Sequence, residues 1–258
     1  MGRVIAIANQ KGGVGKTTTA INLGAALALA GHPTLLIDLD PQGNTSSGVG
    51  IDKNHVDVTV YQCLLGLQPA EKAIVPTQLS NLYLFPATVD LIGAEIELVF
   101  LEEREKRLCR ALNGVHDRFE YVLIDSPPSL GLLTLNALTA ANGVLIPLQC
   151  EFFALEGLTQ LLRTIRRIKQ NLNPDLSIEG VLLTMFDVRT LLSQQVADEV
   201  RRHFEGTVFT TVIPRTVRLS EAPSHGLPIL LYDPRSRGAQ AYRTLAEELL
   251  DHATQGSR

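Results

Sequence analysis

The sequence contains no tryptophan, and its five tyrosines and eight phenylalanines make up only 5% of the 258 residues. Proteins that hold single-stranded nucleic acid without reading its sequence stack successive bases on aromatic side chains. The scarcity of aromatic residues argues against that mode of binding. Any contact with nucleic acid is expected to involve the phosphate backbone instead.

Cysteine is also scarce. Cys63, Cys109 and Cys150 are far apart, include no C-x-x-C pair and leave one residue over in any pairing into disulfides. Disulfide scaffolds and cysteine-bound clusters both depend on cysteines grouped at defined spacings. The three cysteines fit best with the reducing environment of the cytoplasm.

Long apolar segments are absent, since no stretch approaches the roughly 18 consecutive apolar residues of a membrane span. The first apolar run, residues 4–8, directly follows Met1, Gly2 and Arg3, without the basic region and longer apolar core of a signal peptide. Residues 245–252 carry acids, which anionic lipids repel, where a membrane-binding helix would carry bases. We therefore expect a cytoplasmic protein that does not bind membranes.

Short apolar runs alternate with helical patterns along the chain. The runs predict buried strands at residues 4–8, 34–38, 82–85, 121–125, 143–147, 180–185 and 208–213. The helical patterns cover residues 16–30, 94–112, 155–171, 191–204 and 238–252. This alternation predicts an α/β fold with a mainly parallel twisted sheet and helices on both faces. Because no linker or repeat interrupts the chain, residues 1–258 are expected to form one domain.

A glycine-rich loop follows the first strand and opens the first helix, with the sequence Lys11, Gly12, Gly13, Val14, Gly15, Lys16, Thr17, Thr18. Glycines allow backbone amides to surround phosphate oxygens, and the helix N-terminus adds a positive dipole end. Lys16 is expected to reach the β- and γ-phosphates of ATP, and the Thr17 hydroxyl to bind Mg²⁺. A simple glycine-rich turn would explain the glycines but not two lysines and a threonine pair. The loop therefore predicts a P-loop ATPase.

Two further predicted strands end in acids. Asp38 and Asp40 follow the second strand, and Asp125 ends the strand at 121–125. Ligands of open α/β sheets collect at such strand ends. Asp125 is expected to hold Mg²⁺ through water, as the Walker B acid does, and Asp38 to organise the Mg²⁺ shell or the loop. Alternatively, Asp38 and Asp40 only cap the turn that follows them.

The loop resembles that of the deviant Walker A superfamily. Gln10 stands where the ordinary P-loop pattern has its first glycine, and Lys11 is an additional lysine. In that superfamily the additional lysine crosses to the nucleotide of the partner subunit, so the resemblance implies a nucleotide-sandwich dimer. It also assigns to Asp40 the orientation of the attacking water.

Within this superfamily, the chain resembles the ParA/Soj chromosome-partitioning proteins over essentially its whole length. The similar stretches are residues 93–98, 129–134, 154–158, 183–187, 189–190, 212–215, 217–224 and 232–238. The resemblance implies an ATP-bound homodimer that binds double-stranded DNA non-specifically, and hydrolysis stimulated by a ParB/Spo0J-like centromere-binding partner. It implies a nucleoid-associated location, DNA contacts at Arg189 and Arg218, and adenine contacts near Pro214 and Arg215. One departure is Thr216, where the family pattern has asparagine.

Composition gives partial support for contact with DNA. The net charge of −4 provides no overall attraction, so binding requires a local basic patch. Basic residues gather on one predicted helix and near the C-terminus, namely Arg163, Arg166, Arg167, Lys169, Arg215, Arg218, Arg235 and Arg237. For any one of them, a solvated surface charge or a helix-end ion pair is the alternative explanation.

Three other functions use the same nucleotide motifs. A MinD-like membrane switch would need a basic amphipathic C-terminal helix, and an iron–sulfur reductase or carrier would need grouped cysteines. A nucleotide-gated regulator without catalysis would lack the acid that orients water, and Asp40 argues against it only through the resemblance. The MinD-like switch and the nucleotide-gated regulator remain the alternatives to a partitioning ATPase.

Overall fold

The computed structural model describes residues 2–151, 154–204 and 206–255, and its centre is one eight-stranded sheet in the order β3-β4-β2-β5-β1-β6-β7-β8. All neighbouring strands run parallel except β3 and β4. The strands are β1 (Arg3–Ile7), β2 (Thr34–Asp38), β3 (Val75–Pro76), β4 (Leu82–Phe85), β5 (Tyr121–Asp125), β6 (Gly143–Gln149), β7 (Ser177–Phe186) and β8 (Val208–Pro214). The predicted mainly parallel α/β fold is confirmed.

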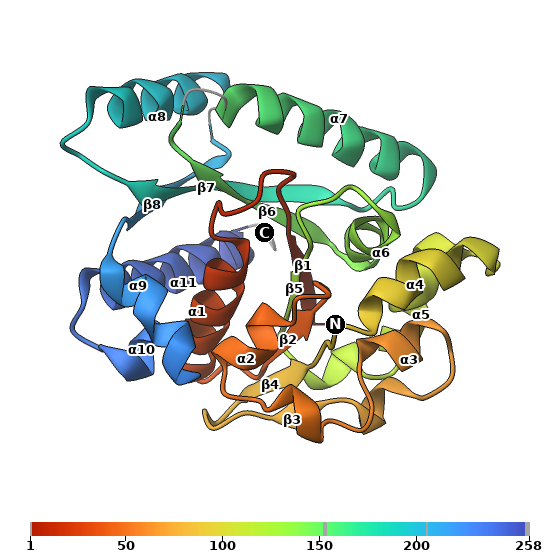
Figure 1. Ribbon diagram of the computed structural model, residues 1–258. Helices are drawn as coiled ribbons and strands as arrows, with labels where there is room; N and C mark the ends of the chain where they lie inside the picture. Colours follow the sequence, from red (N-terminus) through yellow and green to blue (C-terminus); the bar gives the residue numbers. More distant parts are fainter. Residues whose placement is uncertain (1, 152–153, 205, 256–258) are drawn as a thin grey trace.

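Helices cover both faces of the sheet (Figure 1). The α-helices are α1 (Lys16–Leu29), α2 (Asn44–Gly48), α3 (Val60–Leu64), α4 (Leu91–Glu97), α5 (Arg107–Leu112), α6 (Leu132–Ala140), α7 (Ala154–Asn171), α8 (Leu191–His203), α9 (Val217–Glu221), α10 (Ile229–Tyr232) and α11 (Arg237–Gln255). Short 3-10 turns are η1 (Lys53–His55), η2 (Ala70–Lys72), η3 (Leu98–Phe100), η4 (Arg104–Lys106), η5 (His116–Arg118) and η6 (Ala222–His225). The three-layer arrangement explains why the strands are apolar on both faces.

Alternate residues of each strand enter two separate cores. On β1, Val4 and Ala6 pack into the core beneath α3 to α8, whereas Ile5 and Ile7 pack into the core beneath α1 and α9 to α11. This follows from the two-residue period of a strand, which points successive side chains to opposite faces. No helix in the described ranges is both long enough and apolar enough to cross a membrane.

The prediction of one continuous helix over residues 94–112 is wrong, because the structure has two α-helices in this region, α4 and α5. α4 begins at Leu91, continues into η3, and is separated from α5 by a bend in which Glu103 has a left-handed φ of 48°. Asn136 of α6 fixes this bend: its Oδ1 accepts from the Leu108 amide at 3.0 Å and its Nδ2 donates to the Arg104 carbonyl at 2.8 Å. A contact from another helix therefore overrides the local helical pattern.

The predicted motifs lie together at the carboxyl ends of neighbouring central strands. β1, which leads into the phosphate loop, lies between β5 and β6, and β2 lies on the far side of β5. Asp38 and Asp125 are register partners at the ends of β2 and β5. The carboxyl ends of parallel strands therefore bring together the phosphate loop and the acids, as ligand sites in such sheets require.

Candidate nucleotide-binding site

The phosphate loop connects β1 to the first turn of α1. Gly13 and Gly15 have φ angles of 74° and 89°, in the left-handed region that glycine adopts without strain. The Gly15 carbonyl accepts a hydrogen bond from the Thr19 amide at 2.9 Å and so starts the helical ladder. The preceding amides of the first turn have no partner within the helix, and a phosphate group can satisfy them.

Lys16 begins α1, and only 7% of this residue is exposed. Its Nζ donates to the Lys11 carbonyl at 3.1 Å. Burial lowers the pKa of Lys16, while the negative charges of Asp125 and Asp40 act in the opposite direction. The amine is thus held in place and partly desolvated, so that bound phosphate would supply the interactions that burial removes.

The loop forms one wall of a cavity of about 510 Å³, which is in the size range of small-molecule sites. Predicted site residues that line the cavity are Gly13, Gly15, Lys16, Thr17, Thr18, Asp40, Pro214 and Arg215. Lys11, Gly12, Val14, Asp38 and Asp125 do not line it. The cavity therefore unites the phosphate loop with the segment predicted to contact adenine.

Other residues of the cavity wall are not assigned to the site by the sequence analysis, namely Asn44, Pro128, Thr184, Met185, Ile213, Thr216, Leu219, Ser220, Pro223 and Tyr242. The Thr184 hydroxyl donates to the Val14 carbonyl at 2.8 Å and so ties the end of β7 to the phosphate loop. Met185 has a φ of 49°, which is unusual for a residue with a side chain. The signal available for both was their position at the carboxyl end of a predicted strand.

Thr216, the departure from the family pattern, has a clear structural role. It is the N-cap of α9, and its hydroxyl accepts from the Leu219 amide at 3.3 Å. Threonine and asparagine are both favoured at N-caps because each side chain offers an oxygen to the first-turn amides. The substitution therefore preserves the capping of α9 beside the cavity.

Asp125 and Asp38 form a fully buried pair of acids on neighbouring strands. Burial raises the pKa of Asp125 to about 6, and the hydroxyls of Thr45 and Thr17 act in the opposite direction. Burial, together with the charge of Asp125, raises the pKa of Asp38 to about 7. Two carboxylates this close in a dry site resist simultaneous ionisation, so a bound cation would stabilise their charged forms.

The hydrogen bonds of Asp38 favour the loop-organising role over direct metal binding. Its Oδ2 accepts from the Ser46 amide at 2.8 Å and from the Ser46 hydroxyl at 2.7 Å. Its Oδ1 accepts from the Asp40 amide at 3.3 Å. Both oxygens are thus used to hold the chain after β2, and a place for Asp38 in the metal shell stays a prediction.

Asp40 shows features of both proposed roles. Its Oδ1 accepts from the Gln42 amide at 2.9 Å, as a turn-capping acid does, and its carbonyl accepts from the Gly43 amide. Its Oδ2 accepts no hydrogen bond from any residue in the described ranges, and the side chain lines the cavity. One oxygen therefore caps the turn while the other is available to a water molecule.

The polar atoms beside Lys16 fit Mg²⁺. The Thr45 hydroxyl donates to Asp125 Oδ2 at 2.7 Å, whereas the buried Oδ1 accepts no hydrogen bond from the residues that the structure describes. Those residues include no group of three or more His, Cys, Asp or Glu side chains arranged to hold a metal. Mg²⁺ usually binds through one or two protein ligands, waters and substrate phosphates, so Thr17 and Asp125 suffice for it.

The Lys11 side chain does not line the cavity. Its Nζ forms an ion pair with Glu151, two residues beyond the end of β6, and Gln149 also contacts that carboxylate. The Lys11 amide is held by Asn9 Oδ1 at 3.0 Å. The side chains of Lys11 and Glu151 are both substantially exposed, so their pairing is weak and reversible.

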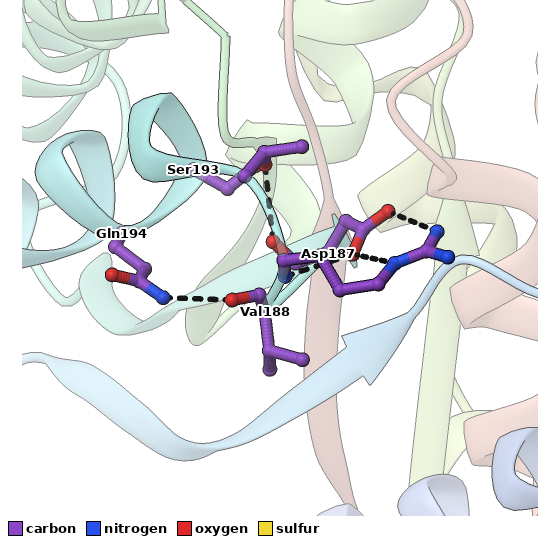
Figure 2. A network of polar contacts seen from close by, with 6 residues as sticks. Asp187, Val188, Ser193 and Gln194 are labelled. Atoms are coloured by element: carbon purple, nitrogen blue, oxygen red, sulfur yellow. Dashed lines mark hydrogen bonds and ion pairs between the residues drawn. The ribbon is translucent and has the colours of Figure 1, made fainter.

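Arg189, predicted to contact DNA, lies in the ordered turn between β7 and α8. Its guanidinium forms two hydrogen bonds with Asp187, at 2.9 and 2.7 Å, and these hold the pKa of Asp187 well below its usual range. The turn is further fixed by a hydrogen bond from Gln194 to the Val188 carbonyl, as Figure 2 shows. The Arg189 side chain is 84% exposed and is paired with a carboxylate.

Arg218, the second predicted DNA contact, is on α9. It pairs with Glu221 at 3.0 Å and with Asp233 at 3.6 Å, and these three side chains are partly or largely exposed. Arg215 lines both the nucleotide cavity and a smaller cavity of about 330 Å³ that it shares with Arg189 and Arg237. The segment from Arg215 to Arg218 therefore connects the nucleotide site with the predicted DNA surface.

The basic cluster on α7 lies elsewhere. Arg163, Arg166, Arg167 and Lys169 are exposed, and α7 packs on the core beneath α3 to α8. Arg166 and Lys169 border a cavity of about 490 Å³ between α7, β7 and the end of α8. This cluster thus lies on the helical layer opposite that of α9 and Arg218.

Comparison with known proteins identifies the family. The model of the AAA domain family matches residues 2–178. The chain is 59% identical over 249 residues to the sporulation initiation inhibitor protein Soj of Bacillus subtilis, covering 96% of this chain and 98% of that protein. It is 54% identical over 250 residues to the chromosome-partitioning ATPase Soj of Treponema pallidum, covering 97% and 98%.

Among solved structures, the fold matches cobyrinic acid a,c-diamide synthase of Mycobacterium smegmatis, which was solved with an ATP analog and magnesium. The TM-score is 0.88, the sequences are 44% identical, and the match covers 99% of this chain and 97% of that one. Together with the phosphate loop, the acids at the ends of β2 and β5 and the shared cavity, these similarities establish that the chain belongs to the ParA/Soj family of chromosome-partitioning ATPases.

Proposed function

We propose that this chain is a single-domain ATPase whose Mg·ATP-bound form is a nucleotide-sandwich dimer that binds DNA non-specifically. Hydrolysis, stimulated by a ParB-like partner, then releases the dimer from DNA. The observation that carries the proposal is that Lys16 and Asp40 line the same cavity. The charge of the buried Asp125 acts on Lys16, whereas the Lys11 side chain pairs with Glu151 and does not line the cavity.

The first step is the binding of the triphosphate. Lys16 and the amides at the start of α1 take the phosphates, and Pro214 and Arg215 take the adenine end of the same cavity. Thr17 and Asp125 would hold Mg²⁺, which neutralises phosphate charge when bound. The mycobacterial relative was solved with an ATP analog and magnesium, which supports Mg·ATP as the nucleotide of this cavity.

Dimerisation depends on the second lysine. Lys11 has no contact with the cavity of its own protomer, and its partner Glu151 is an exposed carboxylate that it can leave at little cost. Across a face-to-face dimer, Lys11 would instead neutralise charge on the partner's triphosphate. A phosphate group carries more charge than one carboxylate, so ATP favours the exchange.

Hydrolysis requires an oriented water molecule. Asp40 is partly exposed at the cavity wall, and the hydrogen bond from the Gln42 amide fixes one of its oxygens. The other oxygen can accept a hydrogen bond from a water molecule beside the γ-phosphate. Asp40 therefore orients the attacking water, while the buried Asp38 holds the loop that carries it.

The DNA surface consists of Arg189 and Arg218 from both protomers. Arg218 pairs with the more exposed Glu221 and Asp233, and such pairs contribute only about 0 to 1 kcal/mol, so a DNA phosphate can displace them. Arg189 pairs with the partly buried Asp187 through two hydrogen bonds, and a phosphate can offer the guanidinium the same paired geometry. The C-terminal helix argues for DNA rather than a membrane. Leu245 and Leu249 of α11 are fully buried in the core, so its apolar face is not available to lipid.

Gel filtration and DNA retention without nucleotide, with ADP and with ATP would test the proposal. We expect dimerisation and retention on unrelated duplexes with ATP alone. A chain that hydrolyses ATP but fails to bind any duplex in the ATP state would refute the partitioning mechanism and favour a different nucleotide-gated switch.

A further inference from the structure

Large apolar side chains are exposed along one side of α4 and η3. Val89, Ile92, Ile96, Val99 and Phe100, named here the α4 stripe, are 47% to 83% exposed. Ile92 and Ile96 are four positions apart and therefore lie on one side of α4, whereas Val89 directly precedes this helix and Val99 and Phe100 follow it in η3. Leu91, Ala94 and Leu98 are fully buried, so the other side of the segment is held in the core. Monomeric proteins rarely expose so continuous an apolar surface without a binding role.

The α4 stripe lies in an acidic segment. Residues 89–103 contain five acids and no lysine or arginine, and the next residue, Arg104, donates to the Val99 carbonyl at 3.2 Å and pairs with Glu105. Glu103 pairs with Lys106 and Arg110, and Glu97 accepts a hydrogen bond from the Tyr61 hydroxyl at 2.8 Å. The remaining charge is negative, so a partner that covers the stripe should be apolar and basic. A second copy of this chain would bring the same acids to the contact and repel it.

Glu95, a partly buried residue of α4, touches the loop that follows Asp125. Its Oε1 is buried and accepts no hydrogen bond within the described residues. A Cβ at Gly131 would lie 2.1 Å from this oxygen, so the carboxylate is packed directly against the Gly131 backbone. Gly131 is the N-cap of α6, and Pro128 of the same loop lines the nucleotide cavity. α4 thus contacts a loop that reaches the cavity predicted to bind the nucleotide.

We propose that the α4 stripe is the docking surface for a basic amphipathic segment of the ParB-like partner. Its engagement acts on the nucleotide site through Glu95 and the loop of residues 126–131. The apolar face of the segment covers Ile92, Ile96 and Phe100, and its basic residues face the surrounding acids. The identity of the partner rests on the proposed function, whereas the chemistry of the surface does not.

The first experiment measures the surface itself. The probe is a fluorescent synthetic helix of lysine and leucine at heptad spacing, compared with a glutamate and leucine helix by anisotropy. We expect the full chain to bind the basic helix in a salt-sensitive manner, and Ile96→Ser with Phe100→Ser to weaken binding at least tenfold. The control is Leu67→Ser, because Leu67 is 64% exposed, close to the 65% of Ile96, but outside the stripe. Equal binding by the stripe variant, or by the acidic helix, refutes the proposal.

The second experiment measures stimulation of ATP hydrolysis by the ParB-like protein of the same organism. The stripe variant should need at least tenfold more partner for half-maximal stimulation, with basal hydrolysis and ATP-dependent dimerisation unchanged. Loss of dimerisation instead would make the stripe a contact between copies and overturn the proposal. Glu95→Ala should keep binding of the basic helix but lose stimulation; full stimulation of this variant would overturn the coupling.

The two proposals fail in different ways. A wild-type chain that binds the basic helix through the stripe, yet lacks ATP-dependent DNA retention, would refute the partitioning mechanism and leave the docking surface standing. Normal retention and stimulation in the stripe variant would refute the docking surface alone. Thermal unfolding of each variant guards against loss of the fold, which is not expected because Ile96 and Phe100 are exposed.

Discussion

Replacing Asp125 by asparagine should stabilise the nucleotide-free protein while weakening its response to Mg·ATP. Burial raises the pKa of Asp125 to about 6, from an ordinary value of 3.8. The folded protein therefore binds more protons than the unfolded chain between these values, and wild-type stability falls as pH rises through this window. Asparagine is uncharged, so its burial carries no cost of desolvating a charge. In the described part of the chain no donor bonds to Asp125 Oδ1, so the amide group of asparagine can take this position without facing another donor.

The expected gain in unfolding free energy follows from the shift in the pKa of Asp125. About two pKa units correspond to roughly 3 kcal/mol of unfolding free energy above pH 6, where the wild-type carboxylate is ionised. At pH 4.5 the unfolded carboxyl is only partly ionised, and the advantage of the variant shrinks to about 1 kcal/mol. For a chain of this size, the gap at pH 8 amounts to roughly 6 °C or more in Tm.

Urea unfolding followed by circular dichroism, in EDTA at pH 4.5 and pH 8, measures both values. Asp57→Asn, at an exposed acid, is the control for replacing a carboxylate by an amide. Added Mg·ATP at about 100 times its Kd should stabilise the wild type by about 2.7 kcal/mol and the Asp125 variant by clearly less. A variant less stable than the wild type at pH 8 in EDTA would refute the reasoning, because the contacts of the carboxylate would then outweigh its burial.

The other predictions concern the steps of the proposed cycle. Lys16→Ala should abolish ATP hydrolysis while the fold survives, and hydrolysis at the wild-type rate would show that the phosphate site is misassigned. Lys11→Ala should bind ATP as a monomer, and normal dimerisation in equilibrium sedimentation would remove its role across the dimer. Asp40→Ala should accumulate the ATP-bound dimer on DNA, whereas normal turnover would favour the turn-capping role. In that background, Arg189→Ala with Arg218→Ala should remove about four phosphate contacts per dimer and flatten the slope of log affinity against log salt by roughly 3 to 4. An unchanged slope would move the DNA surface elsewhere, with α7 as the next candidate.

The sequence predicted the strands well because their signal is local. The expected strands at 34–38, 82–85 and 121–125 coincide with β2, β4 and β5, which are short apolar runs buried on both faces. β3 has only two residues, too few for any periodicity to be recognised. The helix expected over 94–112 failed for the opposite reason, since Asn136, a distant residue, fixes the bend within it.

The distinction between local signals and contacts from distant residues also applies to the candidate site. The phosphate loop is contiguous, so its glycines, Lys16 and Thr17 could be recognised in one short stretch. The opposite wall of the cavity takes Thr184 from β7, Leu219 from α9 and Tyr242 from α11, and the order of the strands decides that these meet. Side-chain partners such as Glu151, which lies 140 positions from Lys11, have no sequence signal at all.

In the proposed mechanism ATP controls DNA binding, and the charges around Arg218 indicate how this control would work. One route is a rearrangement within the protomer that frees Arg218 from Glu221 and Asp233, since α9 also contributes Leu219 to the nucleotide cavity. Breaking such exposed pairs changes the binding free energy by only about 0 to 1 kcal/mol each. Linking two equal patches in a dimer raises affinity by a factor of about 10² to 10⁴, or roughly 3 to 5 kcal/mol, without any new contact. In the proposed mechanism, dimerisation would therefore contribute more to the control of DNA affinity than the release of ion pairs would. The ion pairs at Arg189 and Arg218 would keep the DNA affinity of the single protomer low, so that dimerisation decides whether DNA is bound.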